Sequence, residues 1–255
     1  MRTDAQVMDV SAYAFTHGVR HTRSTLRAWQ RDPMAVLGRW TLGSALAAAG
    51  LLAAVWAIAS LDHEPLTILK LHPPFVVGDA GDVLGVLRRN MLVLALHAMA
   101  CVAGFIAGSS LPLQAQHRQG VSRWVHEHGG RLAILFVIVA TTFSLSAQAF
   151  LIGRALGGVS EFLEISPGLL LLCVLPHAVP ELIALFLPLA AWIIASRRGE
   201  WEQLLAATLV TVAVAMPVLV VSAFVEVYVS PHLFSALTDL HPIEHFAGSA
   251  TFSPR

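Results

Sequence analysis

The chain has 255 residues, of which 56% are hydrophobic and only 13% are charged. Soluble domains usually carry about 25% charged residues, so the composition argues against a soluble domain. The 16 basic residues balance the 16 acidic residues, so the charge favours neither nucleic acid nor an acidic partner. The apolar residues come in long blocks, which indicates an integral membrane protein.

Motifs typical of enzymes are missing from the sequence. No glycine-rich phosphate loop, nucleophile elbow or kinase-like set of motifs occurs. The two cysteines, Cys101 and Cys173, fall inside apolar blocks, where we expect them to act as small apolar side chains rather than as metal ligands. We therefore expect no cofactor and no metal bound by these cysteines.

The first forty residues are polar and rich in arginine, and they lack the short apolar region of a signal peptide. Within them Phe15, Val19, Leu26 and Trp29 recur at near-helical spacing among basic residues. This pattern predicts an amphipathic helix, which would lie on anionic lipid or dock on a partner protein. We expect residues 1–40 to form a basic segment beside the membrane bundle.

Five segments are long and apolar enough to cross a bilayer as helices, which takes about 20 residues. They are residues 41–60, 91–113, 132–152, 168–196 and 204–229. We expect an all-α membrane protein whose transmembrane bundle covers residues 41–230, with a helix at the membrane surface over residues 83–87. The polar residues 231–255 predict a loosely ordered tail.

The arginines predict the orientation of the bundle, because an excess of lysine and arginine marks the cytoplasmic side of a membrane. Most basic residues fall on one side of the predicted bundle: Arg2, Arg20, Arg23, Arg27, Arg31, Arg39, Arg118, Arg123, Arg131, Arg197 and Arg198. The opposite side holds Lys70, Arg88, Arg89, Arg154 and Arg255. We therefore expect a multi-pass protein of the cell membrane, with residues 1–40 in the cytoplasm and residues 231–255 outside it.

The fourth span contains residues that are costly in a membrane, in the stretch PHAVPELI at residues 176–183. As a helix, this apolar block would be about 42 Å long, which exceeds the hydrocarbon core of about 30 Å. Pro176 and Pro180 each remove a backbone donor, so we predict a helix that is broken or kinked near them. His177 and Glu181 are four residues apart and share one helix face.

Other spans contribute further ionisable residues. Glu226 lies in the fifth span, His97 in the second, and Arg154 at the end of the third. Because an ionised carboxylate in a membrane costs at least a few kcal/mol, we expect these three to form one polar cluster with His177 and Glu181. Three interpretations of the cluster stay open: a structural network, a path for protons or substrate in a transporter, and the metal site of an intramembrane enzyme.

The order of these motifs resembles the stage II sporulation protein M family. The family's Pro-His-Gly-x-x-Glu run looks like residues 176–181, with Ala178 in place of the glycine and Pro180 as an extra proline. Its later glutamate, followed by Thr-Pro at the end of the last span, looks like Glu226 followed by Ser230 and Pro231.

Two further motifs of the family have counterparts here, and the resemblance covers about residues 85–232. The pair of asparagines before the family's second span looks like Asn90 followed by Met91. The Asn-Gly-x-x-x-Gly stretch looks like residues 148–153, in which Gln148 and Ala149 replace Asn-Gly and Gly153 is kept. The resemblance therefore marks Asn90, Gly153, Pro176 and Pro231 as family positions.

The resemblance implies a polytopic membrane protein without enzyme activity. In spore-forming bacteria the family acts with cell-wall-cleaving enzymes during engulfment, by holding them at the membrane. This implies a scaffold that recruits partners for cell-envelope or cell-wall remodelling, with membrane lipid, cell-wall hydrolases or other membrane proteins as its partners. If the polar cluster serves this architecture, Glu226→Ala should lower the melting temperature.

Overall fold

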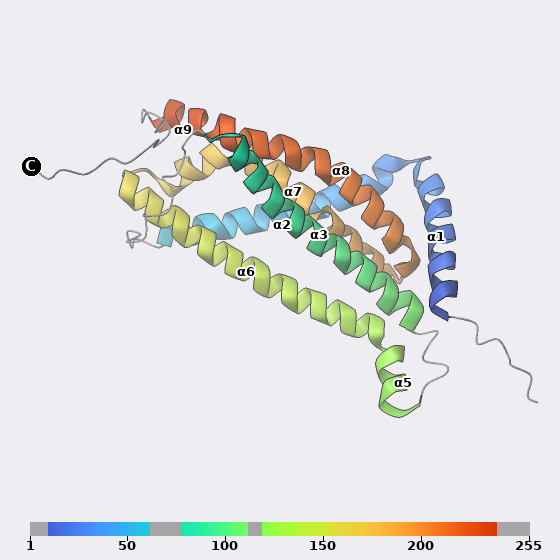
Figure 1. Ribbon diagram of the computed structural model, residues 1–255. Helices are drawn as coiled ribbons and strands as arrows, with labels where there is room; N and C mark the ends of the chain where they lie inside the picture. The colour runs from blue at the N-terminus through green and yellow to red at the C-terminus, as the bar shows by residue number, and fades with distance from the viewer. Residues whose placement is uncertain (1–9, 62–77, 112–118, 239–255) are drawn as a thin grey trace, which may run out of the picture. The chain divides into compact units, whose positions relative to one another are not determined.

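The computed structural model describes residues 10–61, 78–111 and 119–238, and these residues are almost entirely helical (Figure 1). No β-strand occurs among them. The prediction of an all-α protein is confirmed.

Five helical segments are long and apolar enough to cross a membrane, which confirms the predicted number of spans and the multi-pass membrane protein. They are α2 (Pro33–Leu61); α3 (Ala80–Phe105) with η1 (Ile106–Ser110); α6 (Gly129–Leu163); α7 (Pro167–Arg198); and η2 (Trp201–Gln203) with α8 (Leu204–Phe224), η3 (Val225–Val229) and α9 (Ser230–Thr238). Each has more than the roughly 20 residues that span a hydrocarbon core.

The helices extend beyond the apolar blocks that predicted them. Residues 83–87, predicted as a helix at the membrane surface that leads into the second span, are helical and belong to α3, which continues into that span without interruption. Residues 231–238, predicted as part of a loose tail, form most of α9, and residues 239–255 lie outside the described part of the chain. The start of α3 and the residues of α9 have the same explanation. Backbone hydrogen bonding continues a helix through polar residues once the apolar turns have formed it.

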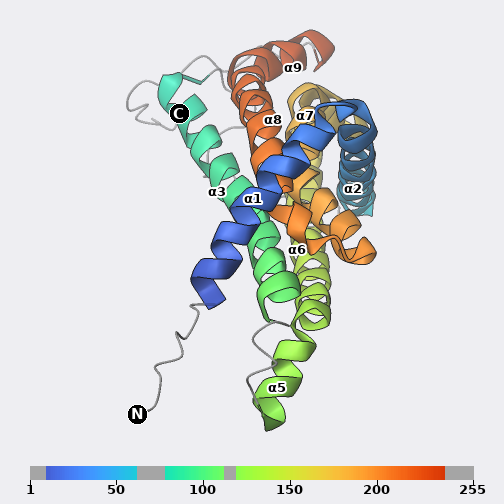
Figure 2. The same ribbon diagram turned by 90° about the vertical axis from the view of Figure 1, so that its right-hand side faces the viewer.

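A separate helix, α1 (Val10–Trp29), precedes the first span, as the amphipathic pattern predicts (Figure 2). A short turn joins it to α2, and Asp32 ends this turn by accepting a hydrogen bond from the N–H of Ala35 at 3.1 Å. Pro33 then occupies the first helical position, where its missing N–H costs nothing. This sequence, an Asp cap followed by proline, explains why the chain starts a new helix here.

The fourth span is predicted to be broken or kinked at its prolines; it is not broken there, and a kink stays a prediction. Helix α7 stays α-helical from Pro167 to Arg198, through both Pro176 and Pro180. Each proline removes one backbone hydrogen bond, whereas a full break would expose several backbone groups to lipid at several kcal/mol each. Its 32 residues give a length of about 48 Å at about 1.5 Å per residue, more than the hydrocarbon core requires.

Irregular winding occurs instead in the second span, at the π-helical turn η1, and in the fifth span. Residues Val225–Val229 form the π-helical turn η3, in which the N–H of Ser230 donates to the carbonyl of Val225. Pro231 follows directly, and its ring would clash with a carbonyl in a regular α-helix, a clash that the wider turn relieves. The turn carries Glu226, so the irregular backbone sits at one of the predicted polar residues.

The chain divides into two compact units, and the division falls inside each span. The first unit comprises the described parts of Met1–Ala47, Leu92–Ser144 and Ile183–Met216. The second comprises the described parts of Ala48–Met91, Leu145–Leu182 and Pro217–Arg255. Each unit has apolar clusters of its own.

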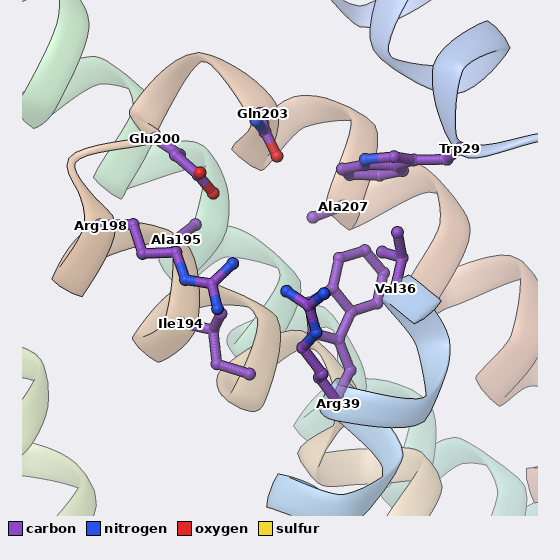
Figure 3. A pocket seen from close by; sticks show the side chains of 10 residues that line it. Trp29, Val36, Arg39, Ile194, Ala195, Arg198, Glu200, Gln203 and Ala207 are labelled. Carbon is purple, nitrogen blue, oxygen red and sulfur yellow. The ribbon is translucent and has the colours of Figure 1, made fainter. Parts of the chain in front are cut away.

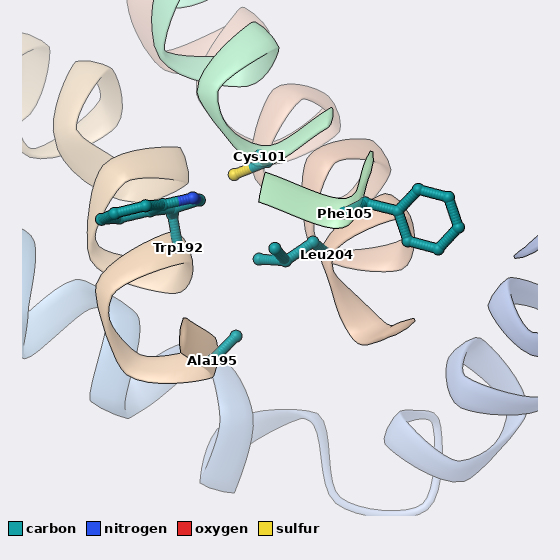
Figure 4. Packing of buried hydrophobic residues seen from close by; sticks show 5 residues of the cluster. All are labelled: Cys101, Phe105, Trp192, Ala195 and Leu204. Atoms are coloured by element: carbon teal, nitrogen blue, oxygen red, sulfur yellow. The ribbon is translucent and has the colours of Figure 1, made fainter. Parts of the chain in front are cut away.

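The first unit is packed around Trp192 of α7. The indole is almost fully buried and shares a cluster with four other buried side chains, shown in Figure 4: Cys101, Phe105, Ala195 and Leu204. Helices α3 and α7 are also joined by polar contacts, since Cys101 Sγ donates to the carbonyl of Pro188 at 3.2 Å. Helix α1 packs against η2, where His21 Nε2 lies 3.0 Å from Glu202 Oε2.

The second unit holds two buried apolar clusters. One joins Val83 and Val86 of α3 to Ala223 and Val227 of the fifth span. The other is made of Leu170, Cys173 and Phe234, with partly buried side chains of α6 packed against it. These clusters fix α3, α7 and the fifth span around the polar residues described next.

Candidate functional site

A cavity of about 430 Å³ lies within the second unit and contains the predicted glutamates. Helices α2, α6 and α7 form its walls, and η3 contributes one residue. Most of the lining is apolar, and the polar lining residues are Gln148, His177, Glu181 and Glu226. Three of the five residues predicted to cluster therefore line one cavity.

Helix geometry places these three side chains. His177 and Glu181 are four residues apart on the continuous helix α7, so they project from the same face. Glu226 comes from the π-turn η3, and π-turns of this kind are frequent at functional sites. An uninterrupted α7 and an irregular fifth span together bring these side chains to the cavity.

His177 is bonded to the end of the fifth span rather than to a glutamate. Its Nδ1 and the Oγ of Ser230 form a hydrogen bond of 2.8 Å. Ser230 is buried, with 3% of its surface exposed, and Pro231 beside it is buried as well. The His177–Ser230 bond thus links α7 to the turn that carries Glu226.

Glu181 has a buried oxygen without a hydrogen bond. Within the described residues, neither its Oε2 nor the Nδ2 of Asn90 makes one. Asn90 and Arg89 lie close enough to act on the Glu181 carboxylate, as does Glu226, but Asn90 does not reach hydrogen-bonding geometry. Buried polar groups are nearly always bonded, so the unbonded oxygen of Glu181 and the unbonded amide nitrogen of Asn90 are unusual for buried atoms.

The charges around the cavity are uneven. Glu181 and Glu226 act on each other, and Arg89 is the basic residue near both of them. Two carboxylates facing one arginine favour the entry of a further hydrogen-bond donor or cation.

The other two predicted residues do not line this cavity. Arg154 lies over the ring of Phe150, with its Cζ 5.7 Å from the ring centroid. His97 belongs to the first unit, where its Nδ1 donates to the carbonyl of Leu185 at 2.7 Å and its ring lies 5.9 Å from that of Phe186. Both residues therefore make contacts outside the cavity.

The family positions have different environments. Asn90 is buried beside Glu181, and Pro231 is buried after η3, whereas Pro176 is exposed. At Gly153 the helix α6 approaches α2 closely: a Cβ there would lie 2.7 Å from Ile58 Cβ and 3.0 Å from a backbone oxygen of α2. Small residues permit such close packing of membrane helices.

Sequence reasoning missed two residues of this site. Arg89 was expected only on the outer side of the bundle, yet it acts on both glutamates. Ser230 was noted only as part of a motif, yet it bonds His177. Their positions next to Asn90 and Pro231 were the only available signal, because neither residue is unusual near the end of a span.

The described residues offer few donors for a metal ion. No group of three or more His, Cys, Asp and Glu side chains among them could hold one. At the cavity, the imidazole of His177 bonds Ser230, and the two glutamates remain. The arrangement is better suited to hydrogen bonding with a polar group that enters an apolar recess.

Comparison with known proteins identifies one family. Residues 131–231 match the family model of stage II sporulation protein M, which supports the resemblance seen in the motifs. The matched residues include the family positions Gly153, Pro176 and Pro231. They also include His177, Glu181 and Glu226 of the cavity, whereas Asn90 precedes the matched region. No curated protein and no solved structure matches the chain.

Proposed function

We propose that this member of the stage II sporulation protein M family is a non-enzymatic membrane scaffold that recruits a partner for cell-envelope or cell-wall remodelling. The main support is the exposure of α6. Of the most apolar 18-residue stretch of α6, only 6% is buried within the protein. The corresponding stretch of each other span is at least 28% buried. A span with so few contacts of its own is available to a partner helix.

The polar cavity adjoins this available helix. Gln148, Ile152 and Ala155 of α6 line the cavity that Glu181 and Glu226 share. A partner helix packed along α6 would therefore reach two carboxylates in an apolar surrounding, where a hydroxyl, amide or basic side chain would be bound selectively. The unbonded Oε2 of Glu181 would gain a donor from such a side chain.

The proposal includes the orientation of the protein in the membrane. Within the described residues, Arg20, Arg23, Arg27, Arg31 and Arg39 precede or begin the first span. We infer that this side is cytoplasmic, since basic residues concentrate there.

A transporter is the second candidate, and the cavity favours it. A recess of about 430 Å³ that includes Glu181 and Glu226 could admit a small polar substrate or protons. The two candidates differ in what accompanies the protein: a scaffold holds another protein, whereas a transporter moves a solute by itself or with an ATPase.

Affinity purification from native membranes in mild detergent tests the scaffold. We expect peptidoglycan hydrolases or division proteins to elute with the wild-type chain. The double variant Glu181→Gln/Glu226→Gln should retain about tenfold less of them, because hydrogen bonds to charged groups are stronger than neutral ones.

The matched control is Glu161→Gln/Glu164→Gln, which removes two exposed carboxylates at the end of α6. It should retain the partner as the wild type does. Elution of an ATPase, or proton or solute flux in vesicles that the double cavity variant abolishes, would contradict the scaffold and support transport.

A further inference from the structure

A second cavity, of about 230 Å³, lies within the first unit where three spans end. It is open on one side and is lined by the end of α1, the start of α2, the end of α7 and the segment that leads into α8 (Figure 3). Its lining residues are Trp29, Val36, Arg39, Trp40, Ile194, Ala195, Arg198, Glu200, Gln203 and Ala207. Unlike the cavity with the glutamates, its lining includes two arginines and two tryptophans.

Two arginines extend into this cavity from different helices. The guanidinium groups of Arg39 on α2 and Arg198 at the end of α7 point toward the same space (Figure 3). Neither makes a hydrogen bond or an ion pair of 4.0 Å or less with any other side chain that the structure describes. Two like charges that face one space, with no described carboxylate within 4.0 Å of either, favour an anion between them.

The remaining polar groups allow an anion to bind. Gln203 supplies an amide that can donate, and Glu200 is the single carboxylate in the lining. Two cations and one carboxylate leave the cavity positive. The carboxylate of Glu200 could also accept a hydrogen bond from a ligand that carries an ammonium group next to its anionic group.

The aromatic wall places this cavity at the membrane surface. Trp29 and Trp40 pack edge to face, with their ring centroids 5.2 Å apart. Tryptophans concentrate where hydrocarbon meets head groups. The ends of α2 and α7 and the start of η2 all lie at this cavity, and each is the end of a membrane-spanning segment.

We propose that this cavity binds a phosphate group, with a phospholipid head group as its source. The planar guanidinium groups of Arg39 and Arg198 match the geometry of phosphate oxygens and can bind them in pairs. Basic pockets between membrane helices bind lipid head groups in this way. A free phosphate has the same chemistry, and its binding would identify the source as soluble instead.

Titration calorimetry on the full-length protein in detergent tests the site, with short-chain phosphatidylglycerol and inorganic phosphate as separate probes. We expect Arg39→Gln and Arg198→Gln each to weaken phosphatidylglycerol binding about tenfold or more, because each removes charge-assisted hydrogen bonds. Arg197→Gln is the matched control: it removes the neighbouring exposed arginine, which does not line the cavity. It should bind as the wild type does.

Arg39→Lys and Arg198→Lys keep the charge but lose the paired geometry, so each should bind more weakly than wild type and more tightly than the corresponding glutamine variant. Thermal melting of every variant verifies folding. Phosphate binding with this same variant pattern, without lipid binding, would support the site and assign it to soluble phosphate. Wild-type affinity of Arg39→Gln and Arg198→Gln for both probes, or equal weakening by Arg197→Gln, would overturn the proposal.

Discussion

Replacing Gly153 with leucine is expected to lower the free energy of unfolding by about 1–3 kcal/mol, the usual cost of overpacking a core. A Cβ at this position would lie 2.7 Å from Ile58 Cβ and 3.0 Å from the carbonyl oxygen of Val55. Backbone cannot yield as the end of a flexible side chain can, so α2 and α6 would have to separate. The measurement is thermal denaturation in one detergent.

Gly50→Leu is the matched control for this variant. Gly50 lies on α2 in the same unit, and a Cβ there would meet nothing within 4 Å. Both substitutions replace glycine with a strong helix former, so Gly50→Leu should be neutral or slightly stabilising. Equal melting temperatures for the two variants would show that the close approach of α2 and α6 is absent.

Replacing Glu181 with glutamine is expected to raise the free energy of unfolding by about 0.5–2 kcal/mol, the usual gain when an unfavourable site is relieved. Glu181 and Glu226 act on each other as like charges, and the Oε2 of Glu181 has no hydrogen bond among the described residues. Glutamine keeps the shape, removes one charge and adds a donor that can face Glu226. Thermal denaturation in detergent again measures the effect.

Whether Glu181→Gln raises or lowers stability distinguishes a partner-binding site from a network that supports the fold. An architectural network predicts that loss of a cavity glutamate lowers stability, as expected for Glu226→Ala from the sequence alone. A site maintained for a partner predicts the reverse, because such sites retain groups that weaken the fold. Glu164→Gln, at an exposed position just after α6, should change stability by less than about 0.5 kcal/mol. A lower melting temperature for Glu181→Gln alone would assign the cluster to architecture.

The spans could be predicted because hydropathy is a local property. Each apolar block of the sequence lies largely within one long helix of the structure. Their ends could not be predicted in the same way. Helix α2, for example, begins at Pro33, where an aspartate cap and a proline set its start among polar residues.

The sequence predicts that the prolines remove backbone hydrogen bonds, but not which proline distorts its helix. Pro176 and Pro180 do remove backbone donors, but the membrane makes a full break costlier than the lost bonds, so α7 remains a helix. Pro231 instead accompanies the π-turn of the fifth span. Which proline distorts its helix depends on the packing of neighbouring helices, which a single sequence does not reveal.

The site was predictable where helix periodicity controls it. Spacing alone places His177 and Glu181 on one face. The approach of Glu226, Arg89 and Ser230 depends on how the second, fourth and fifth spans pack, so it appears only in the structure. His97 could not be assigned from sequence because its partner is a backbone carbonyl of α7, and every residue of that helix has one.

Photo-crosslinking in living cells tests most directly whether α6 receives a partner. A photoreactive phenylalanine derivative is placed at Leu151 of α6 or, as control, at Leu84 of α3; both side chains are 67% exposed and belong to the second unit. The account predicts a crosslinked protein at Leu151, identified by mass spectrometry as a component of the cell-wall machinery, and lipid adducts alone at Leu84. Lipid adducts alone at both positions would contradict the scaffold.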